Sequence, residues 1–433
     1  MPLNAIEQWK QKGELLFNKN FGDNLFPKID DFIASFFAFC DRLNKMDAAL
    51  LTNDELKEIL SQYQQFIQQS LTYFGVSTFQ ATYLLEEEIK KILQTKLKDN
   101  GKTDNYFIAL STPAEMDETM KERVEFSRLI KHNQVNSNEL EQYSRRYPAL
   151  FFNTYSKQEV LSFLKNKINC HKTIEEIDQE IIKIKQGLQR IKIQHQQIYA
   201  EFQNEILHHY AAVLQNNALH RYKLKHVWSG AEYLCLDFII ELCKRIGIPF
   251  DDFIKTYMFS DIHHFLEEKS GLPAAEIEAR KKCMVIHHKN QSTKIYSGDE
   301  AIVYKNKFLI PCEKNNPTRN IIKGMTANKG KITGKARVVH VNDLQKFTID
   351  CQQFQKDEIL VTTMTSPIMV PIIEKASGII TDEGGICSHA AVISREFSIP
   401  CIVGTHGASF SIKTGDVIEL NADVGIITLI GRK

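Results

Sequence analysis

A histidine just after a double glycine is the residue of this sequence best suited to chemistry. His389 follows Gly384-Gly385 and Ser388, with apolar strands expected over 360–363 and 378–381 and a helix over 390–397. The glycines allow a sharp turn with outward-pointing amides, and Ser388 is a good helix N-cap. The first helical turn favours an anion, and a neutral imidazole can act as a nucleophile. The pattern therefore indicates a phosphohistidine at His389.

Each of these residues also has a plainer interpretation when it is taken alone. A single histidine near a helix start is usually a surface or capping residue, and a Gly-Gly pair marks turns in proteins of every kind. Their combination is more specific. The run GGICSHAAVISREFSIPCIVG, residues 384–404, resembles the signature of the swivelling phosphohistidine domain of phosphoenolpyruvate-utilising enzymes. That group includes phosphoenolpyruvate synthase, pyruvate phosphate dikinase, rifampin phosphotransferase and enzyme I of the sugar phosphotransferase system.

The resemblance extends to both sides of this run, from residue 324 to residue 430. Residues 330–339 are similar to the opening strand of the domain, residues 365–371 to its first helix, and residues 413–425 to its closing hairpin. By this resemblance, His389 is the phosphorylated residue. We expect the turn around it to hold the phosphate through Thr381, Gly384, Gly385, Cys387 and Ser388.

Cys387 departs from the pattern of the family. Members often have threonine at this position, two residues before the histidine, and a regulatory protein phosphorylates that threonine in some dikinases. A cysteine does not form an equally stable phosphoester, so we do not expect this regulation here. The thiol could bind phosphate weakly or respond to oxidation, but a small residue chosen for its fit beside the histidine is the preferred interpretation.

The composition is that of a cytoplasmic globular protein. The 433 residues carry 54 basic and 53 acidic side chains, a net charge of +1, and no basic patch that would favour nucleic acid. The nine cysteines are scattered without C-x-x-C spacing, which argues against disulfides and structural zinc. No signal peptide and no membrane-spanning run is expected. We therefore predict a cytoplasmic protein with no metal site, no membrane and no nucleic-acid partner.

The fold class expected is a multidomain α plus α/β protein. Residues 1–283 show helical periodicity and predict a mostly α-helical domain that binds a substrate or a partner. Residues 284–319 predict a connector with strands at 284–286, 293–296, 301–304 and 308–310, followed by a turn-rich linker at 313–317. Residues 320–433 form the expected swivelling β/β/α phosphohistidine domain, for which the linker would serve as a hinge.

The clearest helical periodicity lies in the first domain. Apolar residues alternate at spacings of three and four from Ile174 to Ile198, with His195 on the same seam. We expect the seam to pack against the following helix, at 218–246, with a dimeric coiled coil as the alternative. A histidine tolerated in such a core is a better interpretation of His195 than a ligand.

A fainter resemblance covers part of the helical region. Trp228, Glu241, Arg245, Leu266 and Arg280-Lys281 fall in an arrangement similar to the segment that precedes the swivelling domain in phosphoenolpyruvate synthase-like proteins and in rifampin phosphotransferase. In the latter enzyme this region binds the substrate. A further set of basic residues could help to hold a phosphorylated substrate, although exposed basic residues after a helix are common: Arg280, Lys281, His287 and His288.

The functional prediction is a phosphotransferase component. No glycine-rich phosphate loop occurs in residues 1–300, so no cofactor is expected to bind directly, and we expect ATP and Mg²⁺ on a separate ATP-grasp partner. A phosphoenolpyruvate-binding barrel of about 250 residues does not follow residue 433 either. The acceptor would be a small molecule bound by the helical domain. The alternatives are a protein-to-protein phosphocarrier resembling enzyme I and a non-catalytic scaffold.

Overall fold

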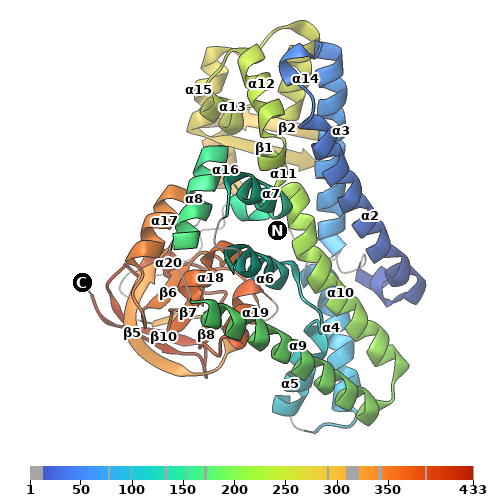
Figure 1. Cartoon of the computed structure of the whole chain (residues 1–433), viewed down its shortest axis with the longest axis vertical. Coiled ribbons are helices and arrows are strands. Elements are labelled where there is room, and N and C mark those ends of the chain that lie inside the picture. The colour runs from blue at the N-terminus through green and yellow to red at the C-terminus, as the bar shows by residue number, and fades with distance from the viewer. Residues whose placement is uncertain are drawn as a thin grey trace. The chain divides into compact units, whose positions relative to one another are not determined.

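The chain divides into two compact units. The computed structural model describes residues 13–76, 79–98, 100–131, 135–152, 154–169, 173–289, 292–308, 321–339, 344–385 and 388–432. Contacts group Met1–Lys157 with Leu164–Pro273, here called the helical unit, and Gln158–Phe163 with Ala274–Lys433, here called the C-terminal unit. The predicted fold class, a large helical part followed by a mixed sheet, is confirmed (Figure 1). The boundaries expected at 283 and 319 stay predictions.

The helical unit is built around one central helix, α10 (Glu205–Trp228), which contacts α2 to α6. Phe32, Phe36 and Phe39 on α2 stack around Phe66 of α3, with ring centroids 5.3–5.7 Å apart. The remaining helices run in chain order: α2 Lys19–Leu43, α3 Asn53–Val76, α4 Phe79–Gln94, α5 Asn100–Ser111, α6 Glu118–Lys131, α7 Ser137–Arg146, α8 Lys157–Asn169, α9 Ile174–Phe202, α11 Ala231–Leu234, α12 Leu236–Ile246, α13 Phe250–Thr256 and α14 Phe259–Glu268. Short 3₁₀ turns lie at η1 (Glu14–Phe17), η2 (Ala48–Leu50) and η3 (Pro148–Phe151). Among the described residues, no helix combines the length and apolar character needed to cross a membrane.

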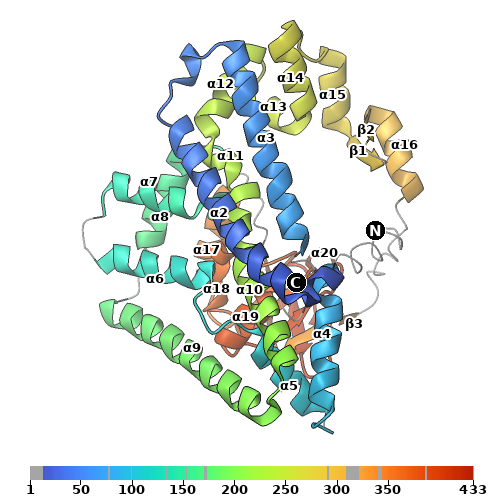
Figure 2. The ribbon, with the colours of Figure 1, turned by 90° about the vertical axis from the view of Figure 1, so that its right-hand side faces the viewer.

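The long helix predicted from the isoleucine seam is present, but its packing differs from the prediction. Figure 2 shows α9 as one long helix, and Thr173 begins it with a capping box. The seam packs mainly against α5 and α6, not against the helix that follows. His195 is buried and its Nε2 lies 2.8 Å from the carbonyl oxygen of Ala109 on α5. His195 is therefore a hydrogen-bonded core residue, in agreement with the prediction that it is tolerated in the core.

The single helix expected over 218–246 is interrupted in the structure. The helix α10 ends at Trp228, and α11 and α12 cover the remainder. A Cβ at Gly230 would lie 2.5 Å from the carbonyl oxygen of His226 and 2.7 Å from the Pro148 ring, so the break needs a residue without a side chain. Pro148 is distant in sequence, and local periodicity could not show this contact.

The connector contains a hairpin and a helix. The strands β1 (Met284–Lys289) and β2 (Ser292–Ser297) pair antiparallel. They correspond to the strands predicted at 284–286 and 293–296. The strand expected at 301–304 is wrong: α16 (Gly298–Phe308) occupies it and packs on α15 (Ala274–Lys282). Asp299 and Glu300 favour the N-terminus of a helix, which explains the difference. The strand expected at 308–310 falls largely, and the linker at 313–317 wholly, outside the described residues.

The C-terminal unit contains one mixed sheet of order β3-β10-β9-β5-β6-β7-β8-β4. The strands β5, β6, β7 and β8 are parallel, and the others pair antiparallel. Their bounds are β3 Ile321–Lys323, β4 Met325–Asn328, β5 Lys331–Val338, β6 Ile359–Thr362, β7 Gly378–Thr381, β8 Cys401–Val403, β9 Val417–Asn421 and β10 Ile426–Gly431. Helices α17 (Leu344–Gln353), α18 (Val370–Ile373), α19 (His389–Glu396) and α20 (Ala408–Ser411) connect them, with a 3₁₀ turn η4 at Pro367–Met369. The strands predicted near 360–363 and 378–381 and the helix predicted after Ser388 are confirmed as β6, β7 and α19.

Candidate active site

Three loops meet at the carboxyl edge of the parallel strands. β6, β7 and β8 are neighbours and run in the same direction, so the segments that follow them lie along one edge (Figure 1). Their described residues are 363–366, 382–385 and 404–407. The backbone ties them together, because the Glu383 amide donates to the carbonyl oxygen of Thr363 and the Thr405 amide to that of Thr381. Parallel α/β sheets place their functional loops at this edge.

His389 is the first residue of α19 and is half-buried. Ser388 caps the helix, and its side chain accepts a hydrogen bond of 3.4 Å from the Ala391 amide. The Oγ1 atom of Thr365, on the loop after β6, lies 2.8 Å from Nδ1 of His389. When Nδ1 donates its hydrogen to this hydroxyl, Nε2 carries the lone pair. In the other tautomer the Thr365 hydroxyl donates to Nδ1 and Nε2 carries the hydrogen. Nε2 is shielded from solvent in this structure, and its role as the nucleophile stays a prediction.

Of the two glycines before His389, only Gly384 has a backbone conformation that favours glycine. Phosphate binding by either glycine stays a prediction. Gly384 has φ +109°, and a Cβ there would lie 2.9 Å from Cβ and Oγ of Ser388. Gly385 has open space around it, and its carbonyl oxygen accepts a 2.9 Å hydrogen bond from the Ser388 amide. The turn that precedes His389 thus depends on glycine at 384 for its backbone conformation. Cys387 lies outside the described residues.

Thr381 lies at the end of β7, but its hydroxyl has a local partner. The side chain is fully buried, and Oγ1 donates a 2.6 Å hydrogen bond to the carbonyl oxygen of Glu383. In this structure the hydroxyl closes the turn after β7. A direct contact of Thr381 with phosphate stays a prediction.

Asp382 is a site residue that the sequence analysis missed. Its buried carboxylate accepts hydrogen bonds from Thr405 Oγ1 (2.9 Å), from the amides of Gly407 and Ser409 (3.1 Å each) and from Ser409 Oγ. These bonds hold the loop between β8 and α20 against the loop that leads to His389. A lone carboxylate directly after a buried strand was the available signal, since such a group requires donors nearby.

The other candidate residues have partners within their own units. Arg280 Nε donates to Glu276 at 2.7 Å, His287 Nδ1 lies 2.7 Å from the Tyr304 hydroxyl, and His288 Nδ1 lies 2.8 Å from Thr293 Oγ1. Substrate binding by these residues and by Lys281 stays a prediction. Arg245 pairs with Glu241 and donates to the carbonyl oxygen of Leu51 at 2.6 Å, which is a structural role.

No metal cluster was found where the structure allows a search. Within the described ranges, no group of three or more histidine, cysteine, aspartate or glutamate side chains is arranged to hold a metal ion. The expectation that Mg²⁺ enters with a nucleotide stays a prediction.

Comparisons with known proteins match the region of this site. The family described as "PEP-utilising enzyme, mobile domain" matches residues 354–425. The probable phosphoenolpyruvate synthase of Methanothermobacter thermautotrophicus is 41% identical over 108 residues, 25% of this chain and 15% of the relative. The phosphoenolpyruvate synthase of Aquifex aeolicus is 38% identical over 149 residues, 34% of this chain and 15% of the relative. An uncharacterized phosphotransferase, YvkC of Bacillus subtilis, is 39% identical over 124 residues, which are 29% of this chain and 14% of the relative. The chain thus spans less than a sixth of the length of these relatives.

Two solved structures show only distant similarity. The holo-form of aconitase X from Thermococcus kodakaraensis is 19% identical, with a TM-score of 0.20, 26% of this chain covered and 99% of the other. A solution structure of Enzyme I is 12% identical, with a TM-score of 0.19. The match covers 73% of this chain and 80% of the other. Scores this low give no support to any conclusion about the fold.

Proposed function

We propose that the protein is a phosphotransferase component that carries a phosphoryl group on His389, a proposal supported by the match of residues 354–425 to the PEP-utilising mobile domain. The observation that carries the proposal is the hydrogen bond of 2.8 Å between Thr365 Oγ1 and Nδ1 of His389. It orients the imidazole at the start of α19 and leaves Nε2 for the reaction. The side chain that the family would phosphorylate is thus set up as a nucleophile.

The chemistry of loading follows from this arrangement. The Nε2 lone pair attacks phosphorus of the donor, the new P–N bond forms, and the bond from phosphorus to the leaving oxygen breaks. Nδ1 keeps its hydrogen bond to Thr365 as the ring becomes cationic. The first turn of α19 and the glycine turn face the phosphoryl oxygens with amide groups, so catalysis rests on positioning and charge stabilisation.

The donor and the acceptor belong to the same proposal. The donor is ATP with Mg²⁺ on a separate ATP-grasp protein. His389 attacks the β-phosphorus and AMP leaves, and water then releases the γ-phosphate as inorganic phosphate, so that the β-phosphoryl group stays on His389. The C-terminal unit then carries the phosphoryl group to a small-molecule acceptor bound by the helical unit. The absence of a glycine-rich phosphate loop from residues 1–300 supports a separate nucleotide-binding partner.

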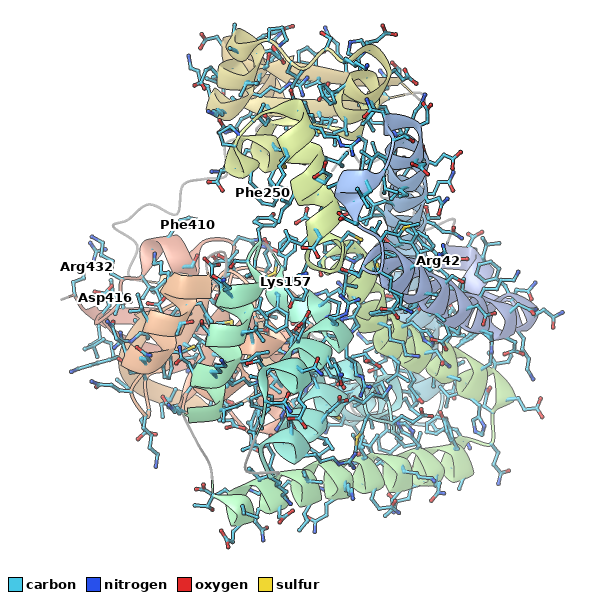
Figure 3. All side chains as sticks on the ribbon, turned by 45° about the horizontal axis from the view of Figure 1, so that its top comes forward. Arg42, Lys157, Phe250, Phe410, Asp416 and Arg432 are labelled. Atoms are coloured by element: carbon cyan, nitrogen blue, oxygen red, sulfur yellow. The ribbon has the colours of Figure 1, made fainter. Side chains whose placement is uncertain are left out.

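One observation favours a protein as acceptor or donor. Phe410 on α20 is 82% exposed, and Met364, just after β6, is 45% exposed. Figure 3 labels Phe410 on the C-terminal unit. Because α20 packs on β6 and β7, both residues belong to the edge that bears His389. Exposed apolar side chains beside a reactive group favour a docking partner, and a protein-to-protein phosphocarrier is the second candidate.

The test is direct labelling of the protein. The chain is incubated with ATP labelled at the β-phosphate, or with labelled phosphoenolpyruvate, each with and without an ATP-grasp protein. We expect an acid-labile, alkali-stable label that is lost in His389→Ala. The matched control is His264→Ala, because His264 is an exposed histidine on α14, outside the three loops at the strand ends, and should leave the label unchanged.

The outcomes separate the candidates. Label that leaves the protein when small-molecule extract is added supports the small-molecule acceptor, and label that passes to another polypeptide supports the phosphocarrier. Absence of label with every donor, or a label that persists in His389→Ala, contradicts the proposal.

A further inference from the structure

The central helix of the helical unit carries hydrogen-bond donors along one face. Asn217, Arg221, Lys225 and Trp228 follow one another on α10 at spacings of four, four and three. At 3.6 residues per turn these side chains leave the helix within a narrow angular range. All of them end in N–H groups, and none offers a carboxylate. Such a row of donors on a central helix requires acceptors or an anion nearby.

Two of these donors are buried and have no acceptor. The indole Nε1 of Trp228 and the amide Nδ2 of Asn217 are shielded from solvent and make no hydrogen bond to any described residue. Leaving a buried donor unpaired costs about 1–3 kcal/mol. Native proteins keep few such groups, and an occupant of the site is a common reason for them.

Lys225 is half-buried and lies near a like charge, the exposed Arg221. Burial lowers the pKa of its ammonium group, and the neighbouring Arg221 guanidinium lowers it further. In the described part of the chain, no carboxylate lies within 4.0 Å of the Lys225 ammonium. A partly buried cation next to another cation is unfavourable unless an anion is present.

Aromatic rings enclose this set of donors. The ring of Trp228 lies 5.5 Å from that of Phe74 on α3 and 6.4 Å from that of Phe152, centroid to centroid. The Arg221 guanidinium lies 5.2 Å from the centroid of Phe74. Phe152 is 50% exposed, so the aromatic group reaches the surface of the protein. Planar or apolar ligands pack well against rings arranged edge to face.

We propose that Arg221, Lys225 and Trp228 form a binding site for an oxyanion of a small molecule, a phosphate or a carboxylate, whose apolar or aromatic body lies against Phe74 and Phe152. A buried water could accept from Trp228 Nε1, but it would not compensate the charge of Lys225. An oxyanion does both, because it accepts several hydrogen bonds and carries the opposite charge. Asn217, farther along the same face, contacts the ligand only if its body is long.

The role of this ligand rests on the proposed function, in which the helical unit holds the phosphate acceptor. The binding site does not depend on that function, because all of its residues lie in the helical unit. A protein without phosphohistidine would still bind the ligand. A phosphorylated protein that does not bind it would leave the proposed function standing and overturn this inference.

The fluorescence of Trp228 can report binding at this site. The chain has two tryptophans, at 9 and 228, so Trp9→Phe gives a full-length protein whose indole fluorescence arises from Trp228 alone. This protein is titrated, without nucleotide, with phenyl phosphate, benzoate and benzyl alcohol. We expect a saturable change in emission with one or both anions and none with benzyl alcohol. Whichever of phenyl phosphate and benzoate binds with the higher affinity identifies the class of oxyanion.

Variants in the same background locate the site. Lys225→Gln and Arg221→Gln are expected to weaken binding about tenfold or more each, since they remove charge-assisted hydrogen bonds. Lys223→Gln is the matched control: it removes the same charge from the same helix, but Lys223 pairs with Asp30 at 2.7 Å. His389→Ala should bind as the parent does. Circular dichroism of each variant confirms that α10 is folded.

Three results would overturn the inference. The first is no saturable change with either anion, and the second is an equal response to benzyl alcohol. The third is equal weakening by Lys223→Gln and Lys225→Gln in folded proteins.

Discussion

Burial decides what each histidine of this chain can do. His389 is half-buried, lies at the start of a helix and has one nitrogen oriented by Thr365. His195 is buried with its Nε2 bonded to a carbonyl oxygen, which satisfies the ring but leaves it no role in chemistry. His226 is 3% exposed, and its Nε2 lies 3.8 Å from Glu118, too far for a hydrogen bond. The same residue type therefore meets different surroundings in this fold, and we expect only His389 of these three to react.

His226 should make the helical unit sensitive to mild acid. Burial lowers its pKa from 6.5 to about 4, and Glu118 opposes this only in part. The unfolded chain therefore binds more protons than the folded one between these values, and stability falls as the pH falls. The stabilisation is fully present above pH 6.5 and is lost on the way to pH 4, by roughly 3 kcal/mol at most. Urea unfolding at several pH values measures this loss.

The comparison for that experiment is His226→Asn, which keeps an acceptor for the Ala149 amide and cannot titrate in this range. Its stability should depend less on pH between 6.5 and 4 than that of the parent. A control, His406→Ala, changes an exposed histidine and should keep the parent's pH dependence. Parallel curves for the parent and His226→Asn would contradict the assignment.

At the scale of elements, local signals predicted local structure well. Apolar runs bounded by turn residues predicted β6 and β7, and Ser388 predicted the start of α19, because strands and caps depend on neighbouring residues. Contacts between distant segments could not be predicted in this way. Thr365 meets His389 only because β6 and β7 are parallel neighbours. The seam of α9 fixes which face is buried, but not which helix buries it.

Among the contacts between elements, we expect the hydrogen bonds of Asp382 to contribute most to the stability of the site. Asp382→Asn keeps the size of the side chain but replaces one oxygen with an NH₂ group that faces the donors of Ser409 and Thr405. The loss of a buried charged acceptor should cost about 2–4 kcal/mol in unfolding free energy of the C-terminal unit. We also expect slower labelling of His389, since the loops at the strand ends lose their common anchor. Chemical unfolding and the labelling rate measure the two effects.

Glu383→Gln is the matched control for Asp382→Asn. Glu383 is the adjacent carboxylate and is exposed, so its substitution should change stability by less than about 0.5 kcal/mol. Equal effects of the two substitutions would mean that the buried hydrogen bonds of Asp382 contribute little.

At the scale of the whole molecule, each unit has a hydrophobic core of its own. In the C-terminal unit, buried residues cover both faces of the sheet, including Leu360 and Ile379 on one and Val361 and Ile380 on the other. In the helical unit, the core surrounds α10 and the phenylalanines of α2. Units with separate cores can unfold separately, so a single free energy does not describe this chain.

We therefore predict two transitions in calorimetry, each shifted by substitutions in one unit. Gly230→Ala places a Cβ 2.5 Å from the His226 carbonyl oxygen and should lower the transition of the helical unit alone. A strain of about 1–3 kcal/mol corresponds to a shift of roughly 2–4 °C per kcal/mol in a unit of this size. Asp382→Asn should lower the other transition alone, while Gly187→Ala, where a Cβ meets open space, should lower neither. One transition lowered equally by Gly230→Ala and Asp382→Asn would instead mean that the two cores unfold as a single cooperative unit.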